Sequence, residues 1–77
     1  SNIYKKIARI NLPDDQLIAA LNSASNGIRS DHYLTETLLA FSNQVNRSSE
    51  KVKSAYRSAI KSINSNTYYG RASKAVD

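Results

Sequence analysis

The sequence predicts an all-α domain of about five helices, and three observations lead to this fold class. Apolar residues recur at spacings of four and three along most of the chain, which is the period of one helix face. The 77 residues include only two glycines and one proline, so few positions interrupt a helix. No segment alternates apolar and polar residues for long enough to indicate a strand.

The first two predicted helices lie on either side of Pro13. Before it, the isoleucines within residues 3–10 recur at helical spacing and predict a short amphipathic helix. After it, Asp14 and Asp15 are expected to cap a longer helix and to place negative charge in its first turn. The apolar stripe of this longer helix is Leu17, Leu21, Ala24 and Ile28.

Three further helices follow, each behind a serine that suits a helix start. Ser30 or Asp31 is expected to cap the first of them, Ser49 the second, and Ser65 or Asn66 the third. The stripes of the first two are Leu34, Leu38, Phe41 and Val45, and then Val52, Tyr56, Ala59 and Ile63. The inward residues of the last helix are Tyr68 or Tyr69, Ala72 and Val76.

The chain resembles itself at an offset of 35 residues, a period typical of helical arrays. Eight of the 41 aligned pairs are identical, against roughly three or four expected by chance from this composition. The pattern predicts two helix-pair units, residues 7–41 and 42–77, stacked as a short solenoid or a compact bundle. Chance agreement between serine- and alanine-rich helices is the alternative. If the units are equivalent, Tyr33 and Tyr68 should both pack against the helix before their corner.

The two corners between paired helices carry a short motif. Residues 28–33 read Ile-Arg-Ser-Asp-His-Tyr, and residues 63–68 read Ile-Asn-Ser-Asn-Thr-Tyr. With this Ile-x-Ser-Asp-x-Tyr pattern, nearly the whole chain resembles a helical repeat of bacterial proteins of poorly defined role, some with metallopeptidase or sensor-like regions. The second copy departs from the pattern at Asn66 and at Gly70-Arg71. The resemblance implies a helical-repeat fold and brings no catalytic residues with it.

Composition bounds the size and setting of the domain. We expect one helical domain over residues 1–77, and the lack of any methionine leads us to expect a piece of a longer protein. The absence of cysteine excludes a disulfide framework and a thiolate metal site. No apolar run is long enough to span a bilayer. The sequence does not indicate a compartment.

The side-chain inventory predicts a protein that is not an enzyme and holds no metal or cofactor. His32 is the only histidine, and we expect it to be a solvated residue beside Asp31. Asp14 and Asp15 are adjacent, so on a helix they diverge by about 100° and cannot act as a catalytic pair. There is no glycine-rich loop of the kind that binds phosphate.

The formal net charge of +5 lies in the second half of the chain. Residues 1–38 carry four basic and four acidic side chains, whereas residues 39–77 carry seven basic and two acidic ones. Lys53, Arg57 and Lys61 recur every four residues and therefore share one helix face, a candidate surface for nucleic acid, acidic lipid headgroups or an acidic protein. A solvated face that keeps the domain soluble is the simpler interpretation.

The last helix adds Tyr69, Arg71 and Lys74 to the candidate binding surface. Tyr69 and Arg71 flank a glycine and would expose an aromatic ring and a guanidinium together. Both residue types are over-represented among binding hot spots. The alternative for Tyr69 is that it completes the core of the last helix.

The sequence therefore predicts a non-enzymatic helical-repeat module for protein–protein interaction or scaffolding, with an unidentified protein or neighbouring repeats as partner. The alternative is binding of nucleic acid or another polyanion through the basic second half, which a salt titration would distinguish. Nucleic acid is not favoured, because the basic helix offers few polar side chains for reading bases. A weaker alternative is a small helical bundle of the immunity or inhibitor type.

Overall fold

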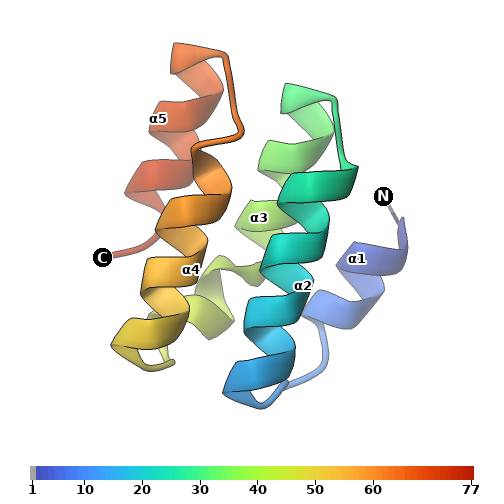
Figure 1. Ribbon diagram of the computed structural model, residues 1–77, viewed down its shortest axis with the longest axis vertical. Helices are drawn as coiled ribbons and strands as arrows, with labels where there is room; N and C mark the ends of the chain where they lie inside the picture. Colours follow the sequence, from blue (N-terminus) through green and yellow to red (C-terminus); the bar gives the residue numbers. More distant parts are fainter. Residues whose placement is uncertain (1) are drawn as a thin grey trace.

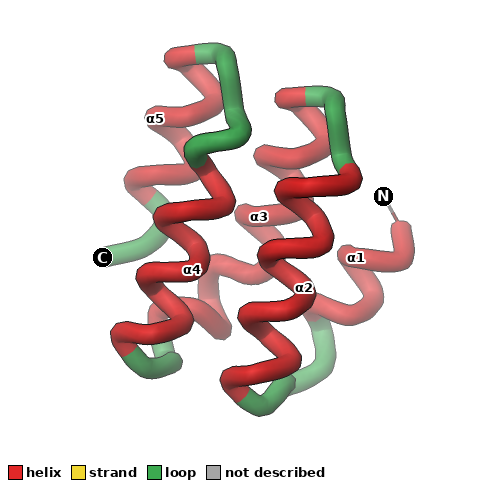
Figure 2. Tube along the Cα trace, viewed as in Figure 1, coloured by secondary structure: helices red, strands yellow, loops and turns green. Residues whose placement is uncertain are grey.

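The computed structural model describes residues 2–77, and within that range it contains five α-helices and no strand (Figures 1 and 2). The helices are α1 (Asn2–Ala8), α2 (Asp14–Gly27), α3 (Asp31–Asn46), α4 (Glu50–Ile60) and α5 (Asn66–Lys74). The predicted all-α class is confirmed. The Cα radius of gyration of 10.8 Å is close to the roughly 11–12 Å expected of a compact domain of this length.

The helices form two layers of antiparallel pairs. The α2–α3 hairpin stacks beside the α4–α5 hairpin, so that α2 packs on α4 in one layer and α3 packs on α5 in the other (Figure 1). Helix α1 lies against the opposite side of α3. As a result α3 is the central helix and contacts all four of the others.

The core contains the apolar stripes that the sequence predicts. Leu21 and Leu38 have no exposed surface, and Tyr56 is only 1% exposed. The remaining predicted residues that are buried are Leu17, Ala24, Leu34, Phe41, Val45, Val52, Ala59, Ile63, Ala72 and Val76. Removing this much apolar surface from water is the main stabilisation available to a chain that has no cysteine and therefore no disulfide.

The first helix differs from the predicted one. It ends at Ala8, and the predicted stripe is mostly uncovered, because Ile3 is 65% exposed and Ile10 is 58% exposed. Ile7 packs against the core, and so does Tyr4, whose hydroxyl is 2.7 Å from Ser23 Oγ on α2. The prediction of one apolar face over residues 3–10 was wrong because α1 ends before Ile10 and because its neighbours leave Ile3, in its first turn, uncovered.

Two side-chain amides at the end of α3 hold the segments on either side of it. Gln44 donates from Nε2 to the Ala8 carbonyl at 2.6 Å and accepts from the Leu12 N–H at 3.1 Å. Asn46 donates from Nδ2 to the Ala75 carbonyl at 2.8 Å and accepts from the Asp77 N–H at 3.0 Å. Each amide thus satisfies a carbonyl at the C-terminal end of a neighbouring helix, which the helix itself leaves unpaired, and one N–H of the segment that follows that helix.

The predicted serine caps at the two corners are confirmed. Ser30 accepts a hydrogen bond from the Tyr33 N–H at 3.3 Å, and Ser65 accepts one from the Tyr68 N–H at 3.4 Å. Asn66 is the first residue of α5 rather than its cap. In each of these standard capping bonds, the N–H of the third helical residue donates to the serine oxygen.

The aspartates do not act as the predicted local caps. Asp31 directs its carboxylate across the stack and accepts from the Asn64 N–H at 3.1 Å and the Ser65 N–H at 2.8 Å. Asp14 accepts from the Ser49 hydroxyl at 2.8 Å, and neither of these two residues caps its own helix through its side chain. The predicted caps were wrong at Asp14 and Asp31 because each is the first residue of its helix and lies beyond the N-cap position, which Pro13 and Ser30 hold. Ser49 holds the N-cap position of α4 without a side-chain hydrogen bond to that helix. The predicted negative charge in the first turn of α2 is confirmed.

The predicted equivalence of Tyr33 and Tyr68 was also wrong. Tyr68 is half-buried and packs against the core, whereas Tyr33 is 59% exposed. The cause is position in the stack: Tyr68 meets His32 of the neighbouring hairpin, while Tyr33 lies at the corner that has no hairpin beyond it within the described chain. Residues about 35 apart nevertheless lie side by side, as Asp14 with Ser49 shows. The 35-residue repeat itself stays a prediction.

Candidate functional site

A groove of about 300 Å³ is lined by residues of α4, of α5 and of the segments that follow them. Its rim carries polar or charged side chains and its floor is mostly apolar. The rim residues are Arg57, Lys61, Tyr69 and Ser73, and the floor residues are Tyr56, Ile60 and Val76. Three of the six predicted surface residues therefore meet at one groove.

Helix α4 places its cations by simple periodicity. Lys53, Arg57 and Lys61 lie four residues apart, so they follow one another along one face. Arg57 and Lys61 are exposed and reach the groove, while Lys53 is half-buried and lies outside its lining. The predicted basic stripe thus contributes two of its three cations to the groove.

The guanidinium of Arg57, at the rim of the groove, is held by two contacts. It donates to the Asp77 carbonyl at 2.8 Å and lies 3.9 Å from a carboxylate oxygen of Glu50. Both members of that ion pair are more than half exposed, so water screens the pair and its stabilisation is small. The charge of Arg57 therefore remains available to a ligand, and its position is fixed mainly by the hydrogen bond to the Asp77 carbonyl.

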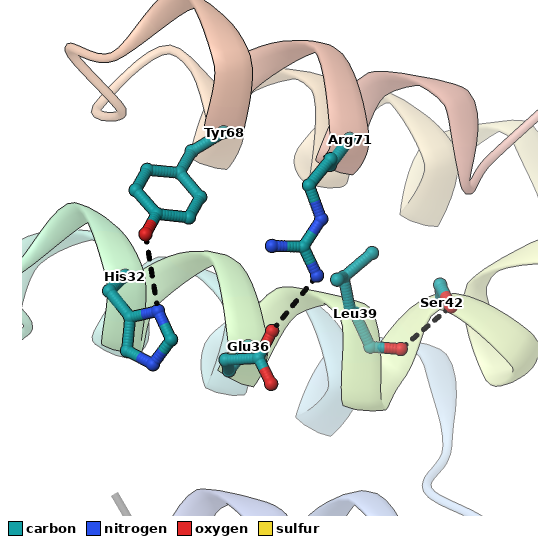
Figure 3. A network of polar contacts seen from close by, with 6 residues as sticks. All are labelled: His32, Glu36, Leu39, Ser42, Tyr68 and Arg71. Carbon is teal, nitrogen blue, oxygen red and sulfur yellow. Dashed lines mark hydrogen bonds and ion pairs between the residues drawn. The ribbon is translucent and has the colours of Figure 1, made fainter.

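Tyr69 and Arg71 do not act together, although they are near neighbours in sequence. Tyr69 is 38% exposed and lines the groove. Arg71 projects from the other face of α5 toward α3, where it contacts Glu36 at 3.2 Å and lies 5.9 Å from the centre of the Tyr68 ring (Figure 3). Arg71 therefore joins the two hairpins and contributes nothing to the groove.

Lys74 is exposed in the last turn of α5 and does not line the groove. Its ammonium group lies near the negative end of the helix, where a cation is mildly stabilising. The four predicted cap residues, Ser30, Asp31, Ser65 and Asn66, lie at the two corners and do not line the groove.

The sequence did not identify Ile60, Ser73 and the floor position of Val76 as groove residues. Tyr56 and Val76 lie on the predicted apolar stripes, which indicate a place in the core. The stripes do not indicate that each of these side chains also borders a groove. Ile60 lies next to the predicted stripe at Ala59 and is 3% exposed. A groove depends on how far two helices separate, which helical periodicity does not report.

His32 is exposed, and the contact of its ring with Tyr68 joins α3 to α5. Its Nδ1 is 3.4 Å from the Tyr68 hydroxyl, and the two rings meet edge to face with centroids 5.8 Å apart (Figure 3). In the part of the chain that the structure describes, no three His, Cys, Asp or Glu side chains gather to form a metal site. In the same range, no helix combines the length and apolarity needed to cross a membrane.

Comparison with known proteins adds no assignment. No family model matches the sequence, and no curated protein or solved structure matches it.

Proposed function

We propose that this chain is a non-enzymatic protein-binding module whose α4–α5 groove takes an acidic segment of a partner protein. The observation that carries the proposal is the composition of the groove. An exposed tyrosine and two exposed cations, Arg57 and Lys61, surround a floor of Tyr56, Ile60 and Val76. Tyrosine and arginine around an apolar pocket are typical of the centres of protein interfaces.

The size and charge of the groove indicate the form of the ligand. A volume of about 300 Å³ is at the lower end of the range for small-molecule sites. It suits one large apolar side chain, with the rest of the partner lying across the rim. Carboxylates on either side of that anchor would meet Arg57 and Lys61.

The alternative is polyanion binding along Lys53, Arg57 and Lys61, and one observation favours it. These residues lie on a single face of α4, and the last two are exposed. A phosphate backbone would use that charge without entering the groove. Its affinity would fall steeply with salt, because each neutralised phosphate releases counterions.

An NMR titration separates the two functions. The labelled chain is mixed with a helical peptide that carries one leucine between glutamates, with the matched peptide in which that leucine is alanine, and with a single-stranded oligothymidylate. We expect the leucine peptide to shift the amides of Lys61, Tyr69 and Ser73, and the alanine peptide to bind about 10-fold more weakly.

Two variants and one control complete the test. Tyr69→Ala should weaken binding of the leucine peptide, whereas Tyr33→Ala, an exposed tyrosine at the distant corner, should leave binding unchanged. Equal affinity for the leucine and alanine peptides would count against the groove. Tight oligonucleotide binding with a steep salt dependence would favour the alternative instead.

A further inference from the structure

The second corner of the fold, residues 61–65, shows how one hairpin of this protein docks on another. Asp31 on α3 accepts from the Asn64 N–H at 3.1 Å and from the Ser65 N–H at 2.8 Å. Next to it, the ring of His32 meets the ring of Tyr68 edge to face (Figure 3). The first turn of one helix thus supplies a carboxylate for two backbone donors and a ring for a tyrosine.

The first corner, residues 28–30, has the same local geometry. Its serine cap has φ −80° and ψ 124°, against φ −73° and ψ 126° for the serine of the second corner. In both corners the serine oxygen accepts from the N–H three residues later, which belongs to a tyrosine. Arg29, Ser30 and Tyr33 therefore occupy the places that Asn64, Ser65 and Tyr68 occupy in the second corner.

The first corner lacks the contacts that complete the second. Among residues 2–77, no side chain accepts from the N–H of Arg29 or of Ser30, and Tyr33 is 59% exposed. Ile28, Arg29, Ser30 and Tyr33 line a hollow of about 330 Å³. Helix α1 does not reach this corner, which lies at the upper end of the α2–α3 hairpin in Figure 1.

We infer that the corner formed by Ile28, Arg29, Ser30 and Tyr33 is a docking site for the first turn of a helix from another protein. That helix would carry an aspartate or glutamate at its first position and a ring-bearing side chain next to it. The carboxylate would accept from the two N–H groups, and the exposed guanidinium of Arg29 adds attraction for it. The ring would pack against Tyr33.

A second copy of this chain fits the corner poorly. The carboxylate and ring at the start of α3 are occupied, as Asp31 and His32 are. The starts of α2 and α4 have a carboxylate but no ring beside it, since Asp15 and Lys51 follow Asp14 and Glu50, and the start of α5 has neither. The side chains of Asn66 and Thr67 offer neither a carboxylate nor a ring. The proposed partner is therefore a helix whose start carries a carboxylate and a ring, and this surface is separate from the α4–α5 groove.

The test uses the labelled full chain and an alanine-rich helical peptide that begins with acetyl-Ser-Asp-His. We expect saturable shifts of the Arg29, Ser30 and Tyr33 amides, with about millimolar affinity because the contact is small. A matched peptide that begins with acetyl-Ser-Asn-Ala should bind at least ~10-fold more weakly, since it lacks the charge-assisted hydrogen bonds and the ring.

Two variants assign the contact. Tyr33→Ala should weaken binding of the aspartate peptide by about 5- to 10-fold, and Tyr69→Ala in the groove should leave it unchanged. Equal binding of the two peptides, shifts at Lys61 and Ser73 instead of the corner, or no shift at millimolar peptide would each overturn the inference. Because the readout is at the corner, its failure leaves the groove proposal intact.

Discussion

The hydroxyl of Tyr56 ties α4 to α5 from inside the core. It donates to the Ala72 carbonyl at 2.7 Å, and the residue is 1% exposed. Burial raises the pKa of Tyr56 from 10.0 to about 12, because the phenolate form would lose its solvation. The unfolded chain therefore releases this proton at lower pH than the folded chain does.

The Tyr56→Phe variant tests this bond through its pH dependence. At pH 7 we expect the variant to be less stable by about 1 kcal/mol, because the Ala72 carbonyl loses its side-chain donor. Between pH 10 and about 12, the wild-type chain should lose up to about 2–3 kcal/mol as the unfolded state ionises first. The variant has no phenol at this position and does not lose this stability, so near pH 12 it should be more stable than the wild-type chain.

Urea denaturation at several pH values measures both free energies. Tyr33→Phe is the control, since the Tyr33 hydroxyl forms no hydrogen bond with the described residues. A constant difference between wild type and Tyr56→Phe from pH 7 to pH 12 would show that Tyr56 is solvated.

At the scale of the elements, residues that look like local caps serve two different purposes. Ser30 and Ser65 cap their own helices, whereas Asp31 and the Asp14–Ser49 pair join one hairpin to the other. A carboxylate in a first turn can accept from any N–H within reach. Here the loop before α5 offers two such donors to Asp31.

Substitutions at the first corner should separate capping from stacking. Ser30→Ala should cost about 0.5–2 kcal/mol and chiefly loosen the start of α3. Asp31→Asn should cost about 1–3 kcal/mol, because a charged acceptor is replaced by a neutral one. Its effect should appear at the Asn64 and Ser65 amides, on the other hairpin.

Amide hydrogen exchange distinguishes these two effects, and Ser65→Ala is the matched cap at the second corner. If Asp31→Asn changed only the exchange of α3, the carboxylate would be a local cap after all. If Ser30→Ala accelerated exchange at Asn64 as much as Asp31→Asn does, the separation of roles would be wrong.

At the scale of the whole molecule, α3 holds the stack together through its last turn. Gln44 secures the end of α1, and Asn46 secures the segment after α5. Gln44 is buried and Asn46 is half-buried. Leaving their backbone partners without a hydrogen bond would therefore lower the stability of the fold. The edges of the bundle therefore depend on two amides of its central helix.

Gln44→Ala should release α1 without unfolding the two hairpins. We expect a loss of about 1–3 kcal/mol and exchange of the α1 amides that is faster by roughly 10- to 100-fold. Asn46→Ala should act in the same way on the end of α5 and leave α1 protected. Unchanged protection of α1 in the Gln44 variant would show that Tyr4 and Ile7 suffice to hold it.

The buried stripes could be predicted because helical periodicity is a local property. Leu17 and Leu21 on α2, and Leu34 and Leu38 on α3, recur at the spacing of one helix face, and a face that is apolar must be covered. The serine caps could be predicted for the same reason, since the acceptor and the N–H lie three residues apart. The exposure of Ile3 and Ile10 could not, because it depends on how much of α1 the neighbouring helix covers.

The candidate site could be predicted only in part. Periodicity placed Arg57 and Lys61 on one face, and both line the groove with Tyr69. Arg71 was grouped with Tyr69 because the two are neighbours in sequence, yet they project from different faces of α5. Without knowledge of which face of α5 meets α3, the sequence could not separate them.

The sequence by itself determined the helices, the buried faces of the four that follow Pro13 and the serine at each corner, because these features depend on groups a few residues apart. Only the tertiary structure decided what the polar side chains between the faces do. Asp31, Arg71 and Gln44 all find partners more than 30 residues away. Their roles follow from the lateral stacking of the hairpins, which also leaves Tyr33 exposed and Tyr68 covered. The same residue type acquires different roles because one corner lies inside the stack and the other at its edge.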